Sequence, residues 1–190
     1  MPLDTLDLQT TDQPRHSVIV LHGLGADGHD FVPICEQLDL DPVGGARFVF
    51  PHAPQRPVTI NRGYVMRAWY DIFGPELPRR EDEAGLRASL ALVRELIARE
   101  NARGTPSERI VLAGFSQGCA MTLLTGLRHE ARLAGLAGLS GYLPLAATTA
   151  AERSAANADV PIFLAHGRAD PVIELARAVA SRDALTALGY

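Results

Sequence analysis

Short apolar runs alternate along the chain with segments in which apolar residues recur every three or four positions. The runs predict strands at residues 17–21 (SVIVL), 46–50 (ARFVF), 109–113, 133–139 and 160–165. The periodic segments predict helices at residues 31–38, 81–103 and 117–128, and a last helix from Pro171 to about Leu188. Strands that alternate with helices are typical of an α/β fold, in which a mainly parallel sheet has helices on both faces.

Residues 52–80 interrupt this alternation, because they are rich in glycine, proline and aromatic side chains and show no regular period. Connections of this length in a compact domain are usually binding loops, lids or disordered segments. Trp69, Tyr70 and Phe73 argue against disorder. We expect residues 61–73 to form one wall of a cleft, with Trp69 facing the substrate. The alternative is that Trp69 is only a core aromatic.

Length and charge narrow the class of protein. The chain has 190 residues, 47% of them hydrophobic, which suits one sizeable core and a single domain over residues 1–190. The net charge is −4, and the 18 basic residues, all arginines, are scattered, which argues against a nucleic-acid partner.

Targeting and metal-binding signals are absent from the sequence. The first ten residues, MPLDTLDLQT, lack the basic and apolar regions of a signal peptide, and no window is apolar for long enough to span a membrane. Cys35 and Cys119 are too few for a disulfide framework and have no metal-ligand spacing. We therefore expect a soluble cytoplasmic protein without a metal site.

Three loops follow predicted strands, and the carboxyl ends of parallel strands gather at one edge of a sheet. They are HGLG at residues 22–25, GFSQG at 114–118 and HGRAD at 166–170. The first offers backbone N–H groups, the second a hydroxyl and the third a carboxylate. Acyl transfer needs these three parts together with an imidazole base.

Ser116 stands between two glycines where a predicted strand turns into a predicted helix. A nucleophile elbow has this pattern, because its tight turn admits only small neighbours and exposes the serine hydroxyl above the sheet. The alternative is an ordinary glycine-rich loop, but the flanking strand and helix favour the elbow. The N–H groups of Gln117, at the helix N-terminus, and of Leu24 would then hold the tetrahedral oxyanion.

Asp170 follows the last predicted strand, downstream of Ser116, which favours a role as the acid of a catalytic triad. The alternative is that it only caps the helix that Pro171 begins. The order along the chain in such enzymes is serine, acid, then histidine, whereas His22 and His166 both precede Asp170. We therefore expect these two histidines to stabilise turns rather than to act as the base.

Four linked motifs resemble one protein family. They are LHGLGAD (21–27), PVTINRGYVMRAWYDI (57–72), LAGFSQG (112–118) and HGRADPVI (166–173). Together they resemble the bacterial carboxylesterases related to acyl-protein thioesterases and lysophospholipases, which have the α/β-hydrolase fold. The resemblance covers nearly the whole chain in the same order, so it is far more specific than GFSQG alone.

The resemblance implies a serine carboxylesterase that acts on esters or thioesters of short to medium acyl chains, and some members act on lipidated proteins or lysophospholipids. It implies that the protein needs no cofactor and that its binding partner is a small or lipid-like acyl ester. It leaves open whether the protein forms a homodimer. Because the fold also supports perhydrolases, a perhydrolase that shares the site stays an alternative. The implied roles are nucleophile for Ser116, triad acid for Asp170, oxyanion donors for Leu24 and Gln117, and acyl-binding cleft for Trp69 and Tyr70.

The sequence departs from the family after its last predicted helix. The family continues with a strand, a loop of the type P-M-G-H that carries the catalytic histidine, and a closing helix, whereas no histidine follows Asp170 before Tyr190. We therefore expect a C-terminally truncated domain in which residues 160–165 form an unpaired sheet edge, and a chain that is nearly inactive without its base. The alternative function is a non-catalytic acyl-binding protein on the same fold.

Overall fold

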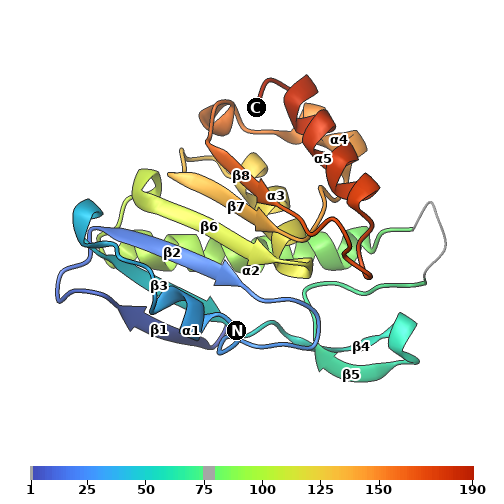
Figure 1. Ribbon diagram of the computed structural model, residues 1–190, viewed down its shortest axis with the longest axis horizontal. Coiled ribbons are helices and arrows are strands. Elements are labelled where there is room, and N and C mark those ends of the chain that lie inside the picture. The colour runs from blue at the N-terminus through green and yellow to red at the C-terminus, as the bar shows by residue number, and fades with distance from the viewer. Residues whose placement is uncertain (1, 75–79) are drawn as a thin grey trace.

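The computed structural model describes residues 2–74 and 80–190, and its centre is a six-stranded sheet (Figure 1). The strands are β1 (Thr5–Gln9), β2 (His16–Leu21), β3 (Ala46–Pro51), β6 (Ile110–Phe115), β7 (Gly135–Leu139) and β8 (Ile162–Ala165). Their order across the sheet is β1-β3-β2-β6-β7-β8. β1 runs antiparallel to β3, while the other neighbouring strands are parallel, which confirms the predicted mainly parallel sheet.

Helices lie on both faces of this sheet, as the sequence predicted. The α-helices are α1 (Val32–Cys35), α2 (Glu83–Ala102), α3 (Gln117–Arg128), α4 (Ala146–Glu152) and α5 (Leu175–Ala187), and 3-10 turns occur at Asp41–Val43, Thr59–Asn61, Ser107–Arg109 and Ala155–Asn157. On β2, Ile19 and Leu21 pack in the core with α2 and α3, whereas Val20 packs with Cys35 of α1 on the opposite face. In the part of the chain that the structure describes, no helix is both long and apolar enough to cross a membrane.

The helix that begins just after Ser116, α3, is the central helix of the fold. All of its residues are buried, because it packs against β2, β6 and β7 on one side and against α2 on the other. Its polar residues Thr122, Thr125 and Arg128 are buried together with its apolar ones, which is typical of a helix enclosed by other elements. The N-terminus of α3 is therefore held firmly at the carboxyl edge of the sheet.

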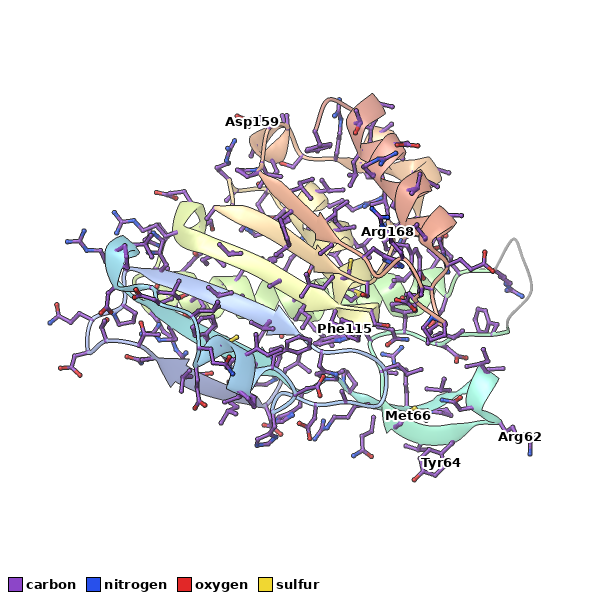
Figure 2. The ribbon with its side chains drawn as sticks, viewed as in Figure 1. Arg62, Tyr64, Met66, Phe115, Asp159 and Arg168 are labelled. Carbon is purple, nitrogen blue, oxygen red and sulfur yellow. The ribbon has the colours of Figure 1, made fainter. Side chains whose placement is uncertain are left out.

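Residues 52–80, which we expected to be irregular, contain an antiparallel hairpin of β4 (Gln55–Val58) and β5 (Tyr64–Arg67). Figure 2 shows Tyr64 and Met66 on this hairpin, which projects beyond the main sheet. The sequence did not predict β4, because Pro51, Pro54 and Pro57 lie shortly before it or within it and proline is uncommon inside strands. Residues 75–79 of the expected loop lie outside the described residues.

Two further elements, β1 and α4, were absent from the predicted arrangement. β1 alternates Leu6 and Leu8 with polar residues, and it pairs along one side only, so its sequence is more polar than that of the central strands. α4 has the sequence AATTAAE, whose small side chains show no clear hydrophobic period. Both lie at the periphery, and neither changes the fold class.

The last helix begins later than predicted, at Leu175 rather than at Pro171. The Oδ1 atom of Asp170 accepts hydrogen bonds from the N–H groups of Val172 (2.8 Å) and Ile173 (3.0 Å), which folds these residues into a separate turn. Glu174 is then extended (φ −56°, ψ 139°) before α5 starts. The carboxylate therefore organises a loop and does not cap a helix.

β8 lies at the edge of the sheet, as the sequence predicted for residues 160–165. Within residues 2–74 and 80–190 it pairs with β7 alone. The side chain of Phe163 is 63% exposed, and Leu164 is also partly exposed. This edge therefore presents both unpaired backbone groups and apolar surface.

Candidate active site

Ser116 occupies the sharp turn between β6 and α3, in a backbone conformation that is rare for a residue with a side chain (φ 55°, ψ −115°). The turn is held on both sides: the Ser116 N–H donates to the Leu139 carbonyl (2.9 Å), and its own carbonyl accepts from Ala120 N–H (3.2 Å). Such strain persists only where surrounding structure supports it, and it often marks a functional position. The geometry is that of a nucleophile elbow.

The two glycines of GFSQG are required by close backbone contacts. A Cβ at Gly114 would overlap the carbonyl group of Gly118, and a Cβ at Gly118 would overlap the carbonyl oxygen of Leu21 at the end of β2. Backbone atoms cannot move aside as a flexible side chain could, so only glycine fits at either position. The motif is therefore explained by the steric demands of the turn around Ser116.

Ser116 opens onto a cavity of about 100 Å³ that also borders the two expected oxyanion donors, Leu24 and Gln117. Within the described residues, the backbone N–H groups of Leu24 and Gln117 donate to no other protein group. The N–H of Gln117 also lies at the positive end of the α3 dipole. These two free donors beside a serine hydroxyl could bind the negative oxygen of a tetrahedral intermediate.

The walls of this cavity come from segments far apart in the sequence. The lining includes Tyr70, Ile72 and Phe73, the three carboxylates Asp71, Glu81 and Asp82, and Tyr142, Val172, Ile173 and Arg177. Of the predicted acyl-binding residues, Tyr70 lies on this wall, and its hydroxyl is 3.1 Å from that of Tyr142. Burial raises the pKa of both tyrosines, so both stay protonated and can donate a hydrogen bond.

Trp69 does not line this cavity, in contrast to our expectation. Its side chain is fully buried, its indole Nε1 donates to the His22 carbonyl (2.9 Å), and its backbone N–H donates to Gln117 Oε1 (3.0 Å). An aromatic side chain in a long connection can face either the solvent or the core, and here its size and its Nε1 donor suit the core. Through these two hydrogen bonds, Trp69 holds the His22 backbone and the Gln117 side chain in place beside the active site.

The side chain of Gln117 has a structural role that the sequence analysis missed. Its Oε1 accepts from Trp69 N–H, and its Nε2 donates to the Tyr70 carbonyl (2.9 Å). The side chain is buried, and it thereby ties the wall of the cavity to the first turn of α3. The sequence signal of this contact was an amide side chain at the first position of a helix that lies in the core, because a buried amide needs hydrogen-bond partners.

Asp170 lies in the loop between β8 and α5, which contributes Val172 and Ile173 to the cavity, although Asp170 is not on its wall. The hydrogen bonds from the N–H groups of Ile173 and Val172 to its Oδ1 lower its pKa, so it is ionised at neutral pH. Its Oδ2 is 3.7 Å from His166 Nε2, too far for a hydrogen bond.

The two histidines nearest these loops stabilise turns, as expected. His22 Nδ1 donates to the Gly23 carbonyl (2.7 Å), its Nε2 accepts from Ala53 N–H (3.0 Å), and burial lowers its pKa, which keeps it neutral. His166 Nε2 donates to the Ile173 carbonyl (2.8 Å). In residues 2–74 and 80–190, no side chain forms a hydrogen bond with the Ser116 hydroxyl.

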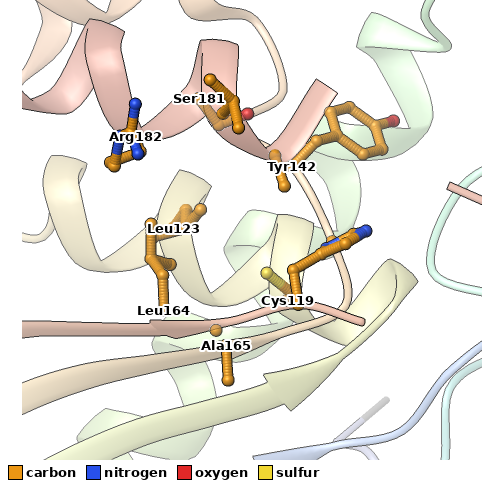
Figure 3. Close-up of a pocket in the computed structure, with 12 residues that line it drawn as sticks. Cys119, Leu123, Tyr142, Leu164, Ala165, Ser181 and Arg182 are labelled. Carbon is orange, nitrogen blue, oxygen red and sulfur yellow. The ribbon is translucent and has the colours of Figure 1, made fainter. Parts of the chain in front are cut away.

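A second cavity, of about 140 Å³, lies between α3 and α5 (Figure 3). Figure 3 shows Cys119 and Leu123 of α3 facing Leu164 of β8, with Ser181 and Arg182 above them on α5. Burial raises the pKa of the Cys119 thiol to about 12, so this thiol is protonated at neutral pH and is no rival nucleophile to Ser116. No cluster of His, Cys, Asp or Glu among the described residues could hold a metal ion.

Comparisons with known proteins agree with this geometry. A family model described as phospholipase/carboxylesterase matches residues 8–190. The chain is 43% identical to acyl-protein thioesterase 1 of Neurospora crassa over 189 residues, which cover 93% of this chain and 76% of that protein. It is 41% identical to acyl-protein thioesterase 1 of Yarrowia lipolytica, with 88% of this chain and 74% of that protein covered.

Solved structures of plant proteins have the same fold. SOBER1 of Arabidopsis thaliana superimposes with a TM-score of 0.86 at 32% identity, over 92% of this chain and 84% of that chain. Acyl-protein thioesterase 2 of Zea mays gives a TM-score of 0.84 at 29% identity, over 98% of this chain and 85% of that chain. Because these relatives are eukaryotic, they do not support the narrower resemblance to bacterial members. Together with the serine elbow and the parallel sheet, the matches show that the chain belongs to the phospholipase/carboxylesterase family of α/β-hydrolases.

Proposed function

We propose that this chain hydrolyses esters or thioesters of short to medium acyl chains through a covalent acyl intermediate on Ser116. Its family consists of serine hydrolases of this reaction class, and relatives carry the name acyl-protein thioesterase. The single observation that carries the assignment is the position of Ser116, strained at the start of α3 and bordering one cavity with two free N–H groups.

In the proposed reaction, Ser116 Oγ attacks the carbonyl carbon of the substrate and gives up its proton to a base. The carbonyl oxygen becomes an oxyanion, which the N–H groups of Gln117 and Leu24 stabilise. The leaving group departs with a proton, and a water molecule then hydrolyses the acyl–serine ester. No residue within 1–190 is assigned as the base that accepts the Ser116 proton.

The proposed role of Asp170 is to orient an imidazole base, which the resembled family carries on a histidine loop beyond the helix that corresponds to α5. Its Oδ1 is occupied by backbone N–H groups, whereas its Oδ2 accepts no hydrogen bond within the described residues. An ionised carboxylate with one free oxygen can accept the N–H of an imidazole and stabilise the imidazolium that forms.

The experiment that tests the proposal is intact-mass spectrometry after mixing the chain with p-nitrophenyl butyrate, and separately with a butyryl thioester. We expect a butyryl adduct, and peptide mapping should place it on Ser116, since the acyl-enzyme is the obligatory intermediate. Release of p-nitrophenol at the same rate by the unsubstituted chain and by Ser116→Ala, without any adduct on Ser116, would contradict the mechanism. Saturable binding of the ester without turnover or adduct would instead support the non-catalytic acyl-binding alternative.

We expect the substitution His166→Gln to change the rate of p-nitrophenyl butyrate hydrolysis by less than about threefold. The glutamine amide can still donate to the Ile173 carbonyl, which is the only hydrogen bond that the imidazole makes within the described residues. If His166 were the base, its loss would reduce kcat by about 10⁴-fold or more, as triad substitutions do. Steady-state kinetics of the variant, with its melting temperature as a check on folding, distinguishes these outcomes.

A further inference from the structure

Two guanidinium groups, those of Arg80 and Arg177, border the cavity beside Ser116, and an apolar acyl chain would use neither of them. We infer that the guanidinium of Arg177 binds an anionic group of the substrate, such as a carboxylate a few atoms away from the ester carbonyl. This inference rests on the proposed function, because it names the substrate class of the same site. It narrows the esters of short to medium acyl chains that the family resemblance implies to esters that also carry an anionic group.

Arg177 lies in the first turn of α5 and is held against the aromatic wall of the cavity. Its Cζ atom is 3.3 Å from the centroid of the Tyr142 ring, which is a cation–π contact. Tyr142 is itself buried and is fixed through its hydroxyl contact with Tyr70. The stacked guanidinium is therefore positioned in advance by the tyrosine ring.

Arg177 has no ion-pair partner within the described residues, where no carboxylate oxygen lies within 4.0 Å of it. On the same helix, Arg182 pairs with Asp183 (2.6 Å), and the partly buried Arg47 pairs with Glu100 (3.0 Å). A guanidinium stays charged at every physiological pH, and partial burial of an unpaired charge is unfavourable. A substrate anion would supply the missing partner, in the bidentate geometry that guanidinium groups favour.

Three carboxylates also border the cavity, and each is already hydrogen-bonded. Asp71 accepts from the Thr59 backbone N–H (2.7 Å) and from its hydroxyl (2.5 Å). Asp82 accepts from the N–H groups of Asp71 (2.8 Å) and Gly85 (2.9 Å), and Glu81 accepts from Leu145 N–H (3.0 Å). These donors hold the carboxylates in the wall, so the charged groups left to meet a ligand are the guanidinium of Arg177 and that of Arg80, whose Cζ lies 5.5 Å from the centroid of the Phe73 ring.

A binding experiment tests this inference without depending on turnover. In the variant Ser116→Ala, we expect monomethyl glutarate to bind about tenfold more tightly than methyl pentanoate, a neutral ester of similar length. The further substitution Arg177→Met, which keeps the length but not the charge, should reduce this ratio to about one. Arg182→Met is the matched control on the same helix and should leave the ratio at about tenfold. Isothermal titration calorimetry or ligand-detected NMR gives the dissociation constants.

Two kinetic comparisons show on which side of the ester the charge lies. With Ser116 present, p-nitrophenyl hemiglutarate is compared with p-nitrophenyl pentanoate, and 4-carboxyphenyl butyrate with phenyl butyrate. In one of these pairs, the kcat/KM of the charged ester divided by that of the neutral ester should fall about tenfold on Arg177→Met and should also fall at about 0.5 M salt. If this is the first pair, the anion lies on the acyl side of the ester. If it is the second pair, the anion lies on the leaving-group side. If Arg177→Met does not fold, Arg177→Lys replaces it; it should keep a preference for the anion but weaken it, because a lysine cannot form the bidentate contact.

Equal binding of the charged and neutral esters by Ser116→Ala would overturn the inference. So would tighter binding of a matched trimethylammonium ester, which would assign the charge selection to Glu81 and its neighbouring carboxylates. An anion preference that depends on Arg177, found without hydrolysis of any ester by the unsubstituted chain, would contradict the proposed function and leave the anion site supported.

Discussion

In a version of the chain that also carries the family's histidine loop, the substitution Ser116→Ala should abolish ester hydrolysis and acyl-adduct formation, with a fall in kcat of about 10⁴-fold or more, as for other serine hydrolases. The reason is that the hydroxyl of Ser116 borders the same cavity as the free N–H groups of Gln117 and Leu24, where it can bond with the substrate carbonyl. Labelling with a fluorophosphonate probe should disappear in parallel. The measurement is the rate of p-nitrophenyl butyrate hydrolysis together with the yield of labelled peptide.

Ser140→Ala is the matched control for this substitution. Ser140 follows β7 much as Ser116 follows β6, it also has a positive φ (46°), and its N–H donates to the Ala165 carbonyl (2.8 Å). It does not begin a helix and does not line the cavity of Ser116. We expect Ser140→Ala to keep its labelling and its rate within about threefold, as a residue outside the reacting groups would. Retained labelling in Ser116→Ala, or its loss in Ser140→Ala, would refute the nucleophile assignment.

The substitution Trp69→Ala should lower the free energy of unfolding by about 3–5 kcal/mol, the usual cost of removing a large buried aromatic side chain. Trp69 is fully buried, and the variant would lose the hydrogen bond from its indole Nε1 to the His22 carbonyl. The cavity left beneath Ser116 would also loosen the loops that hold Leu24 and Tyr70. Urea denaturation followed by circular dichroism measures this loss.

Tyr64→Ala provides the comparison within the same segment of the chain. Tyr64 is 70% exposed on β5, so its removal should change the free energy of unfolding by less than about 0.5 kcal/mol. The opposite pattern for Trp69→Ala, a loss below about 1 kcal/mol with an altered preference between short and medium p-nitrophenyl esters, would show that Trp69 contacts the substrate after all.

The sequence alone did not predict β1, α4 or the β4–β5 hairpin, but it determined the alternation of the main strands and helices and the position of the elbow. These features depend on local chemistry: strands such as residues 17–21 carry strong hydrophobic runs, and the turn at Ser116 needs small neighbours because backbone atoms surround it. Asp170 was likewise identified from its place after the last strand, although its role as triad acid stays a prediction. The family resemblance rests on the same local motifs.

Only the tertiary structure decided which side chains meet around the nucleophile. Burial depends on the packing of distant segments, so the aromatic residues of 52–80 could not be assigned to core or cleft from the sequence, and Trp69 and Tyr70 proved to differ in this respect. Likewise, Arg177 reaches the cavity of Ser116 because α5 begins only after the turn that Asp170 stabilises. Hydrogen bonds and stacking between remote residues set these positions, and a local hydrophobic pattern carries no information about such contacts.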